Sequence, residues 1–319
     1  MRGSVELASI GEARKKLPGA FIEDIYENFS PGTADKILSG MIVDRYTTMR
    51  VNTIKYNVYD LMSFLRSNNI KFERVPWYED GIVLKNARER DIQNFDIYKE
   101  GFVSFQSLSS MIPPIVLNPK ENERVLDMAA APGSKTTQLA ALMNNKGYIL
   151  ANELDKIRSE RLKHKVEVMG ASIVEVVTGR GEKLGESYEE AFDKVLLDTP
   201  CSGEGRFIVG EPSTTRYWSK REVEKLASLQ KKLFKSGCMA LKKGGKMVYS
   251  TCTLNTLENE EVLQWAIDNL DMEIIDLGID IKGAVPGIDE DMDKSLKKAV
   301  RILPSKDMEG FFICRLRKK

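Results

Sequence analysis

The chain has 319 residues, a net charge of +1 at pH 7, 42% hydrophobic residues and 30% charged residues. This length allows one large domain or two ordinary ones, and the composition is typical of a globular protein with a hydrophobic core. No apolar run approaches the length of a membrane span, and the N-terminus lacks the hydrophobic region of a signal peptide. We therefore expect a cytoplasmic protein that does not bind membranes.

The cysteine and histidine content excludes several kinds of site. The four cysteines are scattered singly without a C-x-x-C pair, and His164 is the single histidine. Zinc sites and disulfide frameworks need spaced sets of such residues. We therefore expect no metal, no disulfide framework and no acid–base chemistry based on histidine.

The N-terminal third predicts a separate α+β module. Residues 1–45 carry apolar residues at helical spacing, interrupted by the turn SPGT at 30–33. The segments that follow, up to FVSFQ at 102–106, predict the order β-α-β-β-α-β, which is typical of a split-βαβ fold. Such modules often bind RNA, although the fold alone does not give function. We expect residues 1–106 to form a helical and split-βαβ RNA-binding module.

From about residue 107 the pattern changes to alternating strands and helices. Apolar strands are expected at 123–128, 147–153, 172–178, 192–198, 246–250 and 310–317. A helix over 221–245 is expected to end at its two closing glycines. Near-continuous apolar strands separated by helices predict an α/β domain with a doubly wound, mostly parallel sheet.

The segment RVLDMAAAPGSK at residues 124–135 predicts a ligand-binding turn between a strand and a helix. An apolar strand ends in Asp127, and small residues follow it, which lets backbone approach a ligand at the carboxyl end of a parallel strand. The Walker A pattern is excluded because Ser134 separates Gly133 from the lysine, and the dinucleotide pattern is excluded because the turn has one glycine. A tight turn without a ligand is the alternative.

Polar side chains follow the other predicted strands at the same edge of the sheet. Glu153 ends the second strand, where a carboxylate can accept two hydrogen bonds from a ribose, although an exposed acid before a helix is the alternative. Asp198 ends the fourth strand, and Cys201 and Cys252 follow the fourth and fifth. If these two strands are neighbours, both thiols and Asp198 meet in one cleft.

A thiol, a carboxylate and a bound cofactor together suit chemistry on a pyrimidine ring. Addition of a thiolate to carbon 6 of cytosine makes carbon 5 nucleophilic enough to take a methyl group from a sulfonium donor. Loss of the carbon 5 proton and then of the thiol restores the ring. A carboxylate at the edge of the base favours protonation of the ring nitrogen, and a second thiol can assist release.

Several motifs occur in order along the C-terminal two-thirds of the chain. They are QSLSSM at 106–111, APGSKT at 131–136, LLDTPCSGEG at 196–205, YSTCT at 249–253 with ENE at 258–260, and the closing GFFICRLRK at 310–318. Together they resemble the Sun/Fmu (NOL-NOP-Sun) family of S-adenosylmethionine-dependent RNA cytosine-5 methyltransferases, and MRVNT at 49–53 resembles a further family element. The resemblance implies a class I methyltransferase domain at 107–319, with a Rossmann-like sheet of seven strands.

The resemblance also implies roles for particular residues. Cys252 would be the nucleophile, and Cys201 would help to expel the enzyme from the product. Asp198 would contact the target cytosine, and Lys135 would help to position the base. The implied contacts to S-adenosyl-L-methionine are Ala129, Ala130, Ala131, Pro132, Gly133, Ser134, Lys135, Glu153, Arg158, Thr178 and Asp198.

Several positions depart from the residues that are usual in the family. Ala129 stands where Cys is usual and Ser134 where Gly is usual, and both keep the turn small. Glu153 replaces the usual Asp with a longer carboxylate. The acid usual after the third strand, near the adenine amine, is replaced: either Thr178 takes its place or Glu182 reaches back.

The leading hypothesis is a monomeric enzyme that methylates carbon 5 of a cytosine in RNA. Transfer RNA is preferred over ribosomal RNA, because a compact chain without the C-terminal RNA-binding domain of some relatives suits a small folded substrate. A DNA cytosine methyltransferase would use Cys201 as nucleophile, and the additional Thr-Cys motif at Cys252 argues against it. A non-catalytic RNA-binding or assembly factor is the alternative from another class. The altered residues after the third strand favour that alternative, and the presence of both thiols, Asp198 and Lys135 argues against it.

Overall fold

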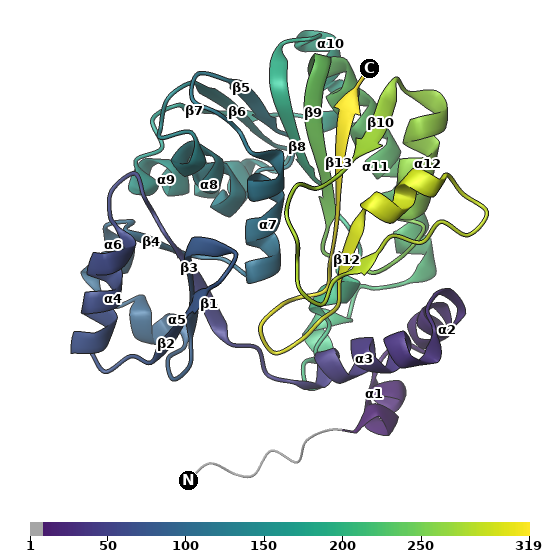
Figure 1. Cartoon of the computed structure of the whole chain (residues 1–319), viewed down its shortest axis with the longest axis horizontal. Helices are drawn as coiled ribbons and strands as arrows, with labels where there is room; N and C mark the ends of the chain where they lie inside the picture. Colours follow the sequence, from purple (N-terminus) through teal and green to yellow (C-terminus); the bar gives the residue numbers. More distant parts are fainter. Residues whose placement is uncertain (1–8) are drawn as a thin grey trace.

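The computed structural model describes residues 9–319, which form two sheets and a helical N-terminal segment (Figure 1). The first helices are α1 (Ile10–Lys16), α2 (Gly19–Asn28) and α3 (Pro31–Ile42). Ser9 and Ser30 are the N-cap residues of α1 and α3, since their side chains accept hydrogen bonds from backbone N–H groups of the first turn. The helical prediction is confirmed at 10–16, 19–28 and 31–42, while residues 1–8 lie outside the described part. The turn predicted at 30–33 is wrong, because residues 31–33 form the first turn of α3, where proline is favoured.

A small antiparallel sheet follows, as the split-βαβ prediction requires. Its elements are β1 (Thr47–Val51), α4 (Val58–Ser67), β2 (Phe72–Val75), β3 (Tyr78–Leu84), α5 (Glu89–Ile92), α6 (Asp96–Lys99) and β4 (Val103–Phe105). The strand order is β2-β3-β1-β4, with antiparallel neighbours throughout. The chain reverses between β2 and β3 at 76–77, where Pro76 favours a turn.

The larger sheet contains nine strands rather than the seven that the family resemblance implied. They are β5 (Arg124–Asp127), β6 (Tyr148–Glu153), β7 (Val174–Thr178), β8 (Phe192–Asp198), β9 (Leu241–Thr251), β10 (Met272–Ile275), β11 (Val285–Pro286), β12 (Val300–Ile302) and β13 (Phe311–Lys318). The order is β11-β12-β13-β9-β8-β5-β6-β7, with β10 also paired to β13. The additional strands are too short to carry a periodic pattern.

Strands β5 to β9 pair in parallel and the remaining strands pair antiparallel, so the predicted α/β class with a mostly parallel sheet is confirmed. The helices of this part are α7 (Leu108–Leu117), α8 (Ser134–Leu142), α9 (Lys156–Met169), α10 (Leu184–Ser187), α11 (Lys220–Ala240) and α12 (Glu260–Asn269). Short 3-10 turns are η1 (Gly181–Lys183), η2 (Glu204–Arg206), η3 (Pro212–Thr214) and η4 (Lys294–Lys298). Within residues 9–319, no helix is both long enough and apolar enough to span a bilayer.

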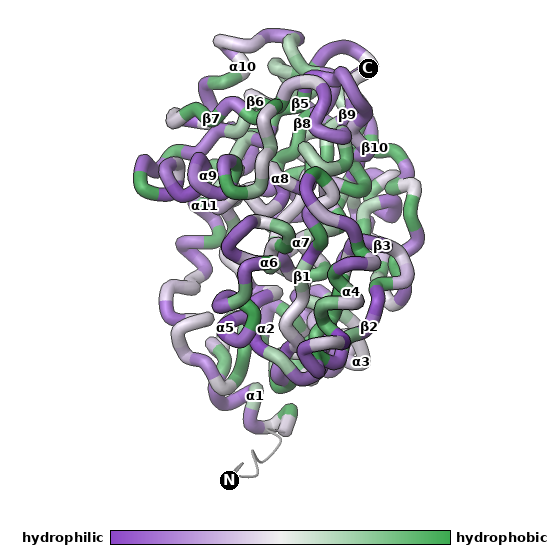
Figure 2. The backbone as a smooth tube through the Cα atoms, turned by 90° about the vertical axis from the view of Figure 1, so that its left-hand side faces the viewer, coloured by the Kyte–Doolittle hydropathy of each residue, from purple (hydrophilic) through white to green (hydrophobic). Residues whose placement is uncertain are grey.

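The helices cover both faces of the larger sheet because strand side chains alternate between them. Val125 and Leu196 belong to one apolar cluster with residues of α7 and α8. Their neighbours Leu126 and Leu197 belong to the opposite cluster with residues of α11 and α12. Hydrophobic residues accordingly follow the central strands in Figure 2, and hydrophilic residues predominate on the outer turns.

The predicted glycine end of the helix at 221–245 is wrong. Helix α11 ends at Ala240, and the chain continues directly into β9 at Leu241, which is fully buried and pairs with Phe192 of β8. Gly244 has a φ of +73°, and the pairing register between β8 and β9 shifts nearby. The glycine therefore allows an irregularity within β9 and does not end a helix. Burial of Leu241 in the sheet therefore decides where the helix ends.

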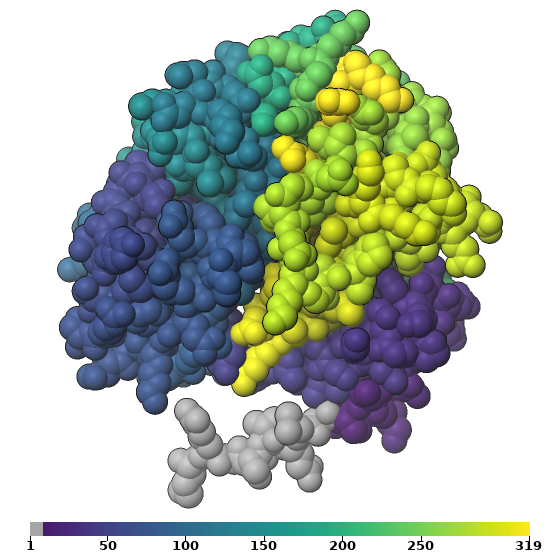
Figure 3. Space-filling view, in the orientation of Figure 1, coloured from purple at the N-terminus to yellow at the C-terminus, as the bar shows by residue number. Residues whose placement is uncertain are grey.

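The N-terminal helices pack on the loops that follow β8 and β9. Phe21 and Ile37 share an apolar cluster with Phe207, Val209 and Leu254. In the space-filling view, these helices lie against the C-terminal strands, while the small sheet lies to one side (Figure 3). The first part of the chain thus supports the loops at one edge of the larger sheet.

The contact between α3 and the C-terminal region predicts a local effect of substitution. Gly40 lies so close to Pro304 that an added Cβ would stand 1.8 Å from its carbonyl oxygen. We expect Gly40→Ala to lower the free energy of unfolding by on the order of 2 kcal/mol, because the helix must move away. Chemical denaturation followed by fluorescence measures this change.

Gly32→Ala in the same helix is the matched control, because no atom lies within 4 Å of its added Cβ. It should leave stability unchanged or raise it by up to about 1 kcal/mol. Equal destabilisation by both substitutions would contradict the close packing of α3 on Pro304.

Candidate active site

A large cavity lies where the strand order reverses direction. The chain leaves β5 toward β6 and β7 on one side, and β8 and β9 lie on the other side, so a crevice forms at the carboxyl ends of β5 and β8. The cavity there has a volume of about 1230 Å³. Its lining includes Asp127, Glu153 and Asp198 from strand ends, and also Arg88 and Gln106 from the N-terminal part of the chain. The site is therefore shared between the two sheets.

The small-residue turn lines one part of this cavity. Ala129, Ala130, Ala131, Pro132, Ser134 and Lys135 all line it. Gly133 does not, because it has a φ of +102° and faces α9, where an added Cβ would lie 2.7 Å from Leu162. Glycine is therefore needed at this position to begin α8 close to α9.

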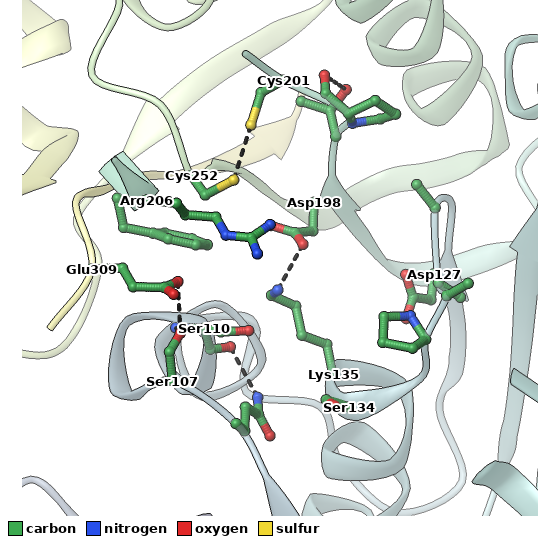
Figure 4. Close-up of a pocket in the computed structure, with 18 of the residues that line it drawn as sticks. Ser107, Ser110, Asp127, Ser134, Lys135, Asp198, Cys201, Arg206, Cys252 and Glu309 are labelled. Atoms are coloured by element: carbon green, nitrogen blue, oxygen red, sulfur yellow. Dashed lines mark hydrogen bonds and ion pairs between the residues drawn. The ribbon is translucent and has the colours of Figure 1, made fainter. Parts of the chain in front are cut away.

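An ion pair joins this turn to the end of β8. Lys135 Nζ lies 2.6 Å from Asp198 Oδ2, and Ser250 Oγ donates to Asp198 Oδ1 at 2.7 Å (Figure 4). Burial lowers the pKa of the Lys135 ammonium, but the adjacent Asp198 carboxylate outweighs burial and leaves the pKa above its usual value. The lysine is thus held as a cation, aimed at the carboxylate.

The two thiols lie together beside this ion pair. Cys201 Sγ and Cys252 Sγ are 3.3 Å apart, so the strand pattern correctly predicts that they converge (Figure 4). Gly205 N donates to Cys252 O at 3.0 Å, and Ser202 N donates to Glu258 Oε2 at 3.0 Å. These bonds connect the loop after β8 with the loop after β9, and therefore set the spacing of the two sulfur atoms.

The surroundings of the two thiols differ. The hydrogen bond to Cys252, together with burial and nearby acids, raises the pKa of Cys201 well above its usual value. The Arg206 side chain extends into the cavity beside Cys252 (Figure 4). Burial lowers the pKa of Arg206, but Cys252, Glu309 and Cys201 outweigh it and raise the pKa. The geometry therefore keeps Cys201 protonated and places a cation next to Cys252.

Two acids near the site are buried: Asp127 ends β5, and Glu204 lies in η2 after β8. Burial raises the pKa of Asp127 to about 7, although Thr136 Oγ1 donates to it at 2.7 Å. Burial likewise raises the pKa of Glu204 to about 7, and its Oε1 accepts from Trp218 Nε1 at 3.0 Å and from Asn255 at 3.1 Å. Both carboxyl groups exchange a proton near neutral pH.

Another part of the cavity is lined by polar groups that suit a ligand containing a ribose. The Glu153 carboxylate is 5% exposed and lines the cavity, where it can accept hydrogen bonds from ribose hydroxyls. Arg158 lies 3.6 Å from it and donates to Ala131 O at 2.8 Å, which ties α9 to the turn. Asn152 also lines the cavity, and its Oδ1 is buried without a hydrogen-bond partner among the described residues. This oxygen can therefore accept a hydrogen bond from a ligand.

The structure does not place every predicted contact in the cavity. Thr178 is not among its lining residues, and its hydroxyl lies 2.6 Å from Ser159 Oγ. Glu182, the other possibility for the residue near the adenine, does line the cavity and pairs with Arg180 at 2.6 Å. Glycine at 181 allows this approach, since an added Cβ would lie 2.8 Å from Leu233.

Sequence reasoning missed several lining residues, including Arg206, Glu309 and Phe311. The strand pattern marks residues that follow parallel strands. Strand β13 runs antiparallel to β9, so the residues at its beginning lie at the same edge as the carboxyl ends of the parallel strands. Recognition of an antiparallel last strand would have indicated Glu309 and Phe311. No sequence signal marks Arg206, whose position depends on the turn η2.

Comparison with solved structures confirms that this is a class I methyltransferase fold. A methyltransferase homologue from Pyrococcus horikoshii superposes with a TM-score of 0.84 at 33% identity, covering 97% of this chain and 98% of that one. The sequence model of the family described as 16S rRNA methyltransferase RsmB/F matches residues 114–317. The chain therefore belongs to the RsmB/F family, which consists of S-adenosylmethionine-dependent methyltransferases.

Two curated relatives differ in the RNA that their names specify. Ribosomal RNA small subunit methyltransferase F of Shewanella loihica is 38% identical over 281 residues, which cover 85% of this chain and 56% of the relative. The tRNA (cytosine(49)-C(5))-methyltransferase of Pyrococcus abyssi is 38% identical over 276 residues, which cover 85% of this chain and 88% of the relative. The chain thus spans a little over half the length of the first relative.

The buried Glu204 predicts a pH dependence of stability. Between its ordinary pKa of 4.5 and about 7, the folded protein keeps the proton and the unfolded chain releases it, so stability falls as the pH rises through this range. Glu204→Gln removes this proton exchange. We expect the difference in unfolding free energy, Glu204→Gln minus parent, to rise by on the order of 3 kcal/mol from pH 4.5 to pH 8.

Urea denaturation at several pH values measures this difference. Glu224→Gln, at an exposed position of α11, is the matched control and should follow the parent at every pH. A constant difference between Glu204→Gln and the parent across the range would contradict the prediction.

Proposed function

We propose that the protein transfers a methyl group from S-adenosylmethionine to carbon 5 of a cytosine in RNA. The observation that carries this proposal is the pair of thiols 3.3 Å apart, beside the Lys135–Asp198 ion pair, in one cavity of an RsmB/F family member. A thiol supplies covalent activation of the pyrimidine, and a carboxylate next to it can hold the edge of the base.

In this proposal Cys252 is the nucleophile. Its sulfur adds to carbon 6 of the cytosine, so a carbon–sulfur bond forms and the ring electrons move toward carbon 5. The Arg206 side chain extends into the cavity beside Cys252, so its positive charge lies next to the sulfur (Figure 4). After methyl transfer, the carbon 5 proton leaves to solvent, the carbon–sulfur bond breaks and the ring double bond re-forms. Cys201 keeps its proton and lies 3.3 Å from Cys252, so it can protonate the departing sulfur.

Asp198 and Lys135 orient the base in this scheme. Asp198 is fixed from both sides, by Ser250 at 2.7 Å and by Lys135 at 2.6 Å, so its carboxylate cannot turn away from the cavity. A carboxylate in this place favours protonation at the edge of the cytosine, which makes carbon 6 more electrophilic. Lys135 follows directly after the turn at the end of β5. Its ion pair with Asp198 therefore holds that turn in position relative to the base.

The cofactor supplies an electrophilic methyl group when bound. Residues 129–132 and Ser134 line the cavity with small side chains and would hold the methionine part. Glu153 would accept hydrogen bonds from the ribose, with Arg158 holding the carboxylate in place. For the adenine amine, Glu182 is favoured over Thr178, since Glu182 alone of the two lines the cavity.

Transfer RNA is the proposed substrate, and residues 1–106 are the proposed RNA-binding module. The supporting observation is the coverage of the Pyrococcus abyssi relative, whose name specifies a tRNA, over 88% of its length, against 56% for the Shewanella loihica relative, whose name specifies ribosomal RNA. The cavity lining includes residues of this module, so RNA held by the module would reach the thiols. The target cytosine must be unpaired or flipped out to enter the cavity.

Substitution of each thiol tests the assigned roles. We expect Cys252→Ala to abolish the covalent protein–RNA adduct, because the attacking sulfur is gone. Cys201→Ala should let the adduct accumulate, because the group that assists release is gone. Denaturing gel electrophoresis with labelled RNA and S-adenosylmethionine measures both, and Cys238→Ala, a buried helix position away from the cavity, is the control. The reverse pattern would exchange the two roles.

Nucleoside analysis tests the substrate. The protein is incubated with S-adenosylmethionine carrying an isotopic methyl group and with either bulk transfer RNA or ribosomal RNA. We expect labelled 5-methylcytidine in the transfer RNA pool, detected by mass spectrometry after digestion. Label confined to ribosomal RNA would overturn the substrate proposal, and cofactor binding without label in either pool would favour a non-catalytic RNA-binding factor.

A further inference from the structure

One buried arginine of the small sheet contacts the cofactor-binding turn of the larger domain. Arg50 lies in β1 and has no exposed surface. Its Nη2 donates to Thr137 Oγ1 at 3.1 Å and to Ser134 O at 3.5 Å, both in the first turn of α8. Ser134 itself lines the cavity. Arg50 is therefore separated from the cofactor surface by a single residue.

The other donors of Arg50 are also used. Its Nε donates to Gln106 Oε1 at 3.3 Å, and its Nη1 donates to Val51 O at 3.1 Å. Gln106 Nε2 in turn donates to Gln138 Oε1 of α8 at 2.7 Å. Two routes, one through Arg50 and one through Gln106, thus connect the small sheet with α8, and the bond between Arg50 and Gln106 links them.

Arg50 makes these bonds without a carboxylate at ion-pair distance among residues 9–319. The charged or titratable groups around it are Tyr78, Asp80 and Lys165, which interact with it at longer range. A buried cation is costly unless its hydrogen bonds are satisfied. Neutral acceptors supplied by α8 therefore stabilise the cation only while the turn and β1 keep their relative positions.

We infer that Arg50 is a positioning residue, which couples the N-terminal module to the turn that binds the cofactor. The planar guanidinium is suited to this, because its fixed fork reaches acceptors on both parts at once, which a flexible ammonium cannot do. The inference rests on the proposed function for the identity of the cofactor. It gives the sequence MRVN at 49–52 a role apart from catalysis, since Arg50 touches no reacting atom.

The test compares arginine substitutions by calorimetric titration with S-adenosylmethionine. We expect Arg50→Met to raise the Kd by about tenfold or more and Arg50→Lys by roughly threefold, because lysine keeps the charge and loses the fork. In methylation assays the KM for the cofactor should rise while kcat at saturating cofactor is retained. A residue with a general structural role would not give this separation.

Arg301→Lys is the matched control. Arg301 is also fully buried, but its Nη2 pairs with Glu260 at 2.7 Å, in contact with α12 and not with the cofactor turn. We expect this variant to lose stability without a change in the Kd. Equal weakening of cofactor binding by Arg301→Lys and Arg50→Lys, or unchanged binding in both Arg50 variants, would overturn the inference.

Hydrogen exchange of the backbone amides at 133–137 gives a measurement that needs no cofactor. We expect faster exchange in Arg50→Lys than in the parent, and no change at these amides in Arg301→Lys. If the parent protein itself fails to bind S-adenosylmethionine, the proposed function fails, whereas the exchange rates still decide whether Arg50 holds the turn. Unchanged exchange in both Arg50 variants would contradict the inference.

Discussion

The ion pair between Lys135 and Asp198 is the interaction on which the arrangement of the site depends. It joins the turn after β5 to the end of β8, across the place where the strand order reverses. Both side chains are largely withdrawn from solvent, so loss of either would leave an uncompensated charge in the cavity. The cofactor turn and the thiol loops are therefore held at a defined separation by one pair of opposite charges.

The N-terminal part of the chain completes the site from two directions. Helices α1 to α3 pack through Phe207 and Leu254 on the loops that carry the thiols, and β1 reaches the cofactor turn through Arg50. The module proposed to bind RNA thus contacts both the loops that carry the thiols and the turn proposed to hold the cofactor. Under the proposed function, this arrangement would place an RNA outside the cavity relative to a methyl donor inside it.

The two thiols have different surroundings although they lie close together. Cys201 stays protonated because it is buried and hydrogen-bonded to Cys252, whereas Cys252 has the Arg206 cation beside it. A nucleophile and a proton donor need opposite protonation states at the same pH. The environment of each sulfur, more than its identity as cysteine, distinguishes the two proposed roles.

Sequence alone determined the parallel strands β5 to β9, the small-residue turn after β5 and the acids and thiols at strand ends, because local periodicity and short turns specify them. Tertiary structure decided the rest. The end of α11 at Ala240 depended on burial of Leu241 against β8, and the placement of Glu309 depended on β13 running antiparallel. Arg50 reaches Thr137 across 87 positions of sequence, a contact that no local pattern encodes, since it forms only when two folded sheets meet.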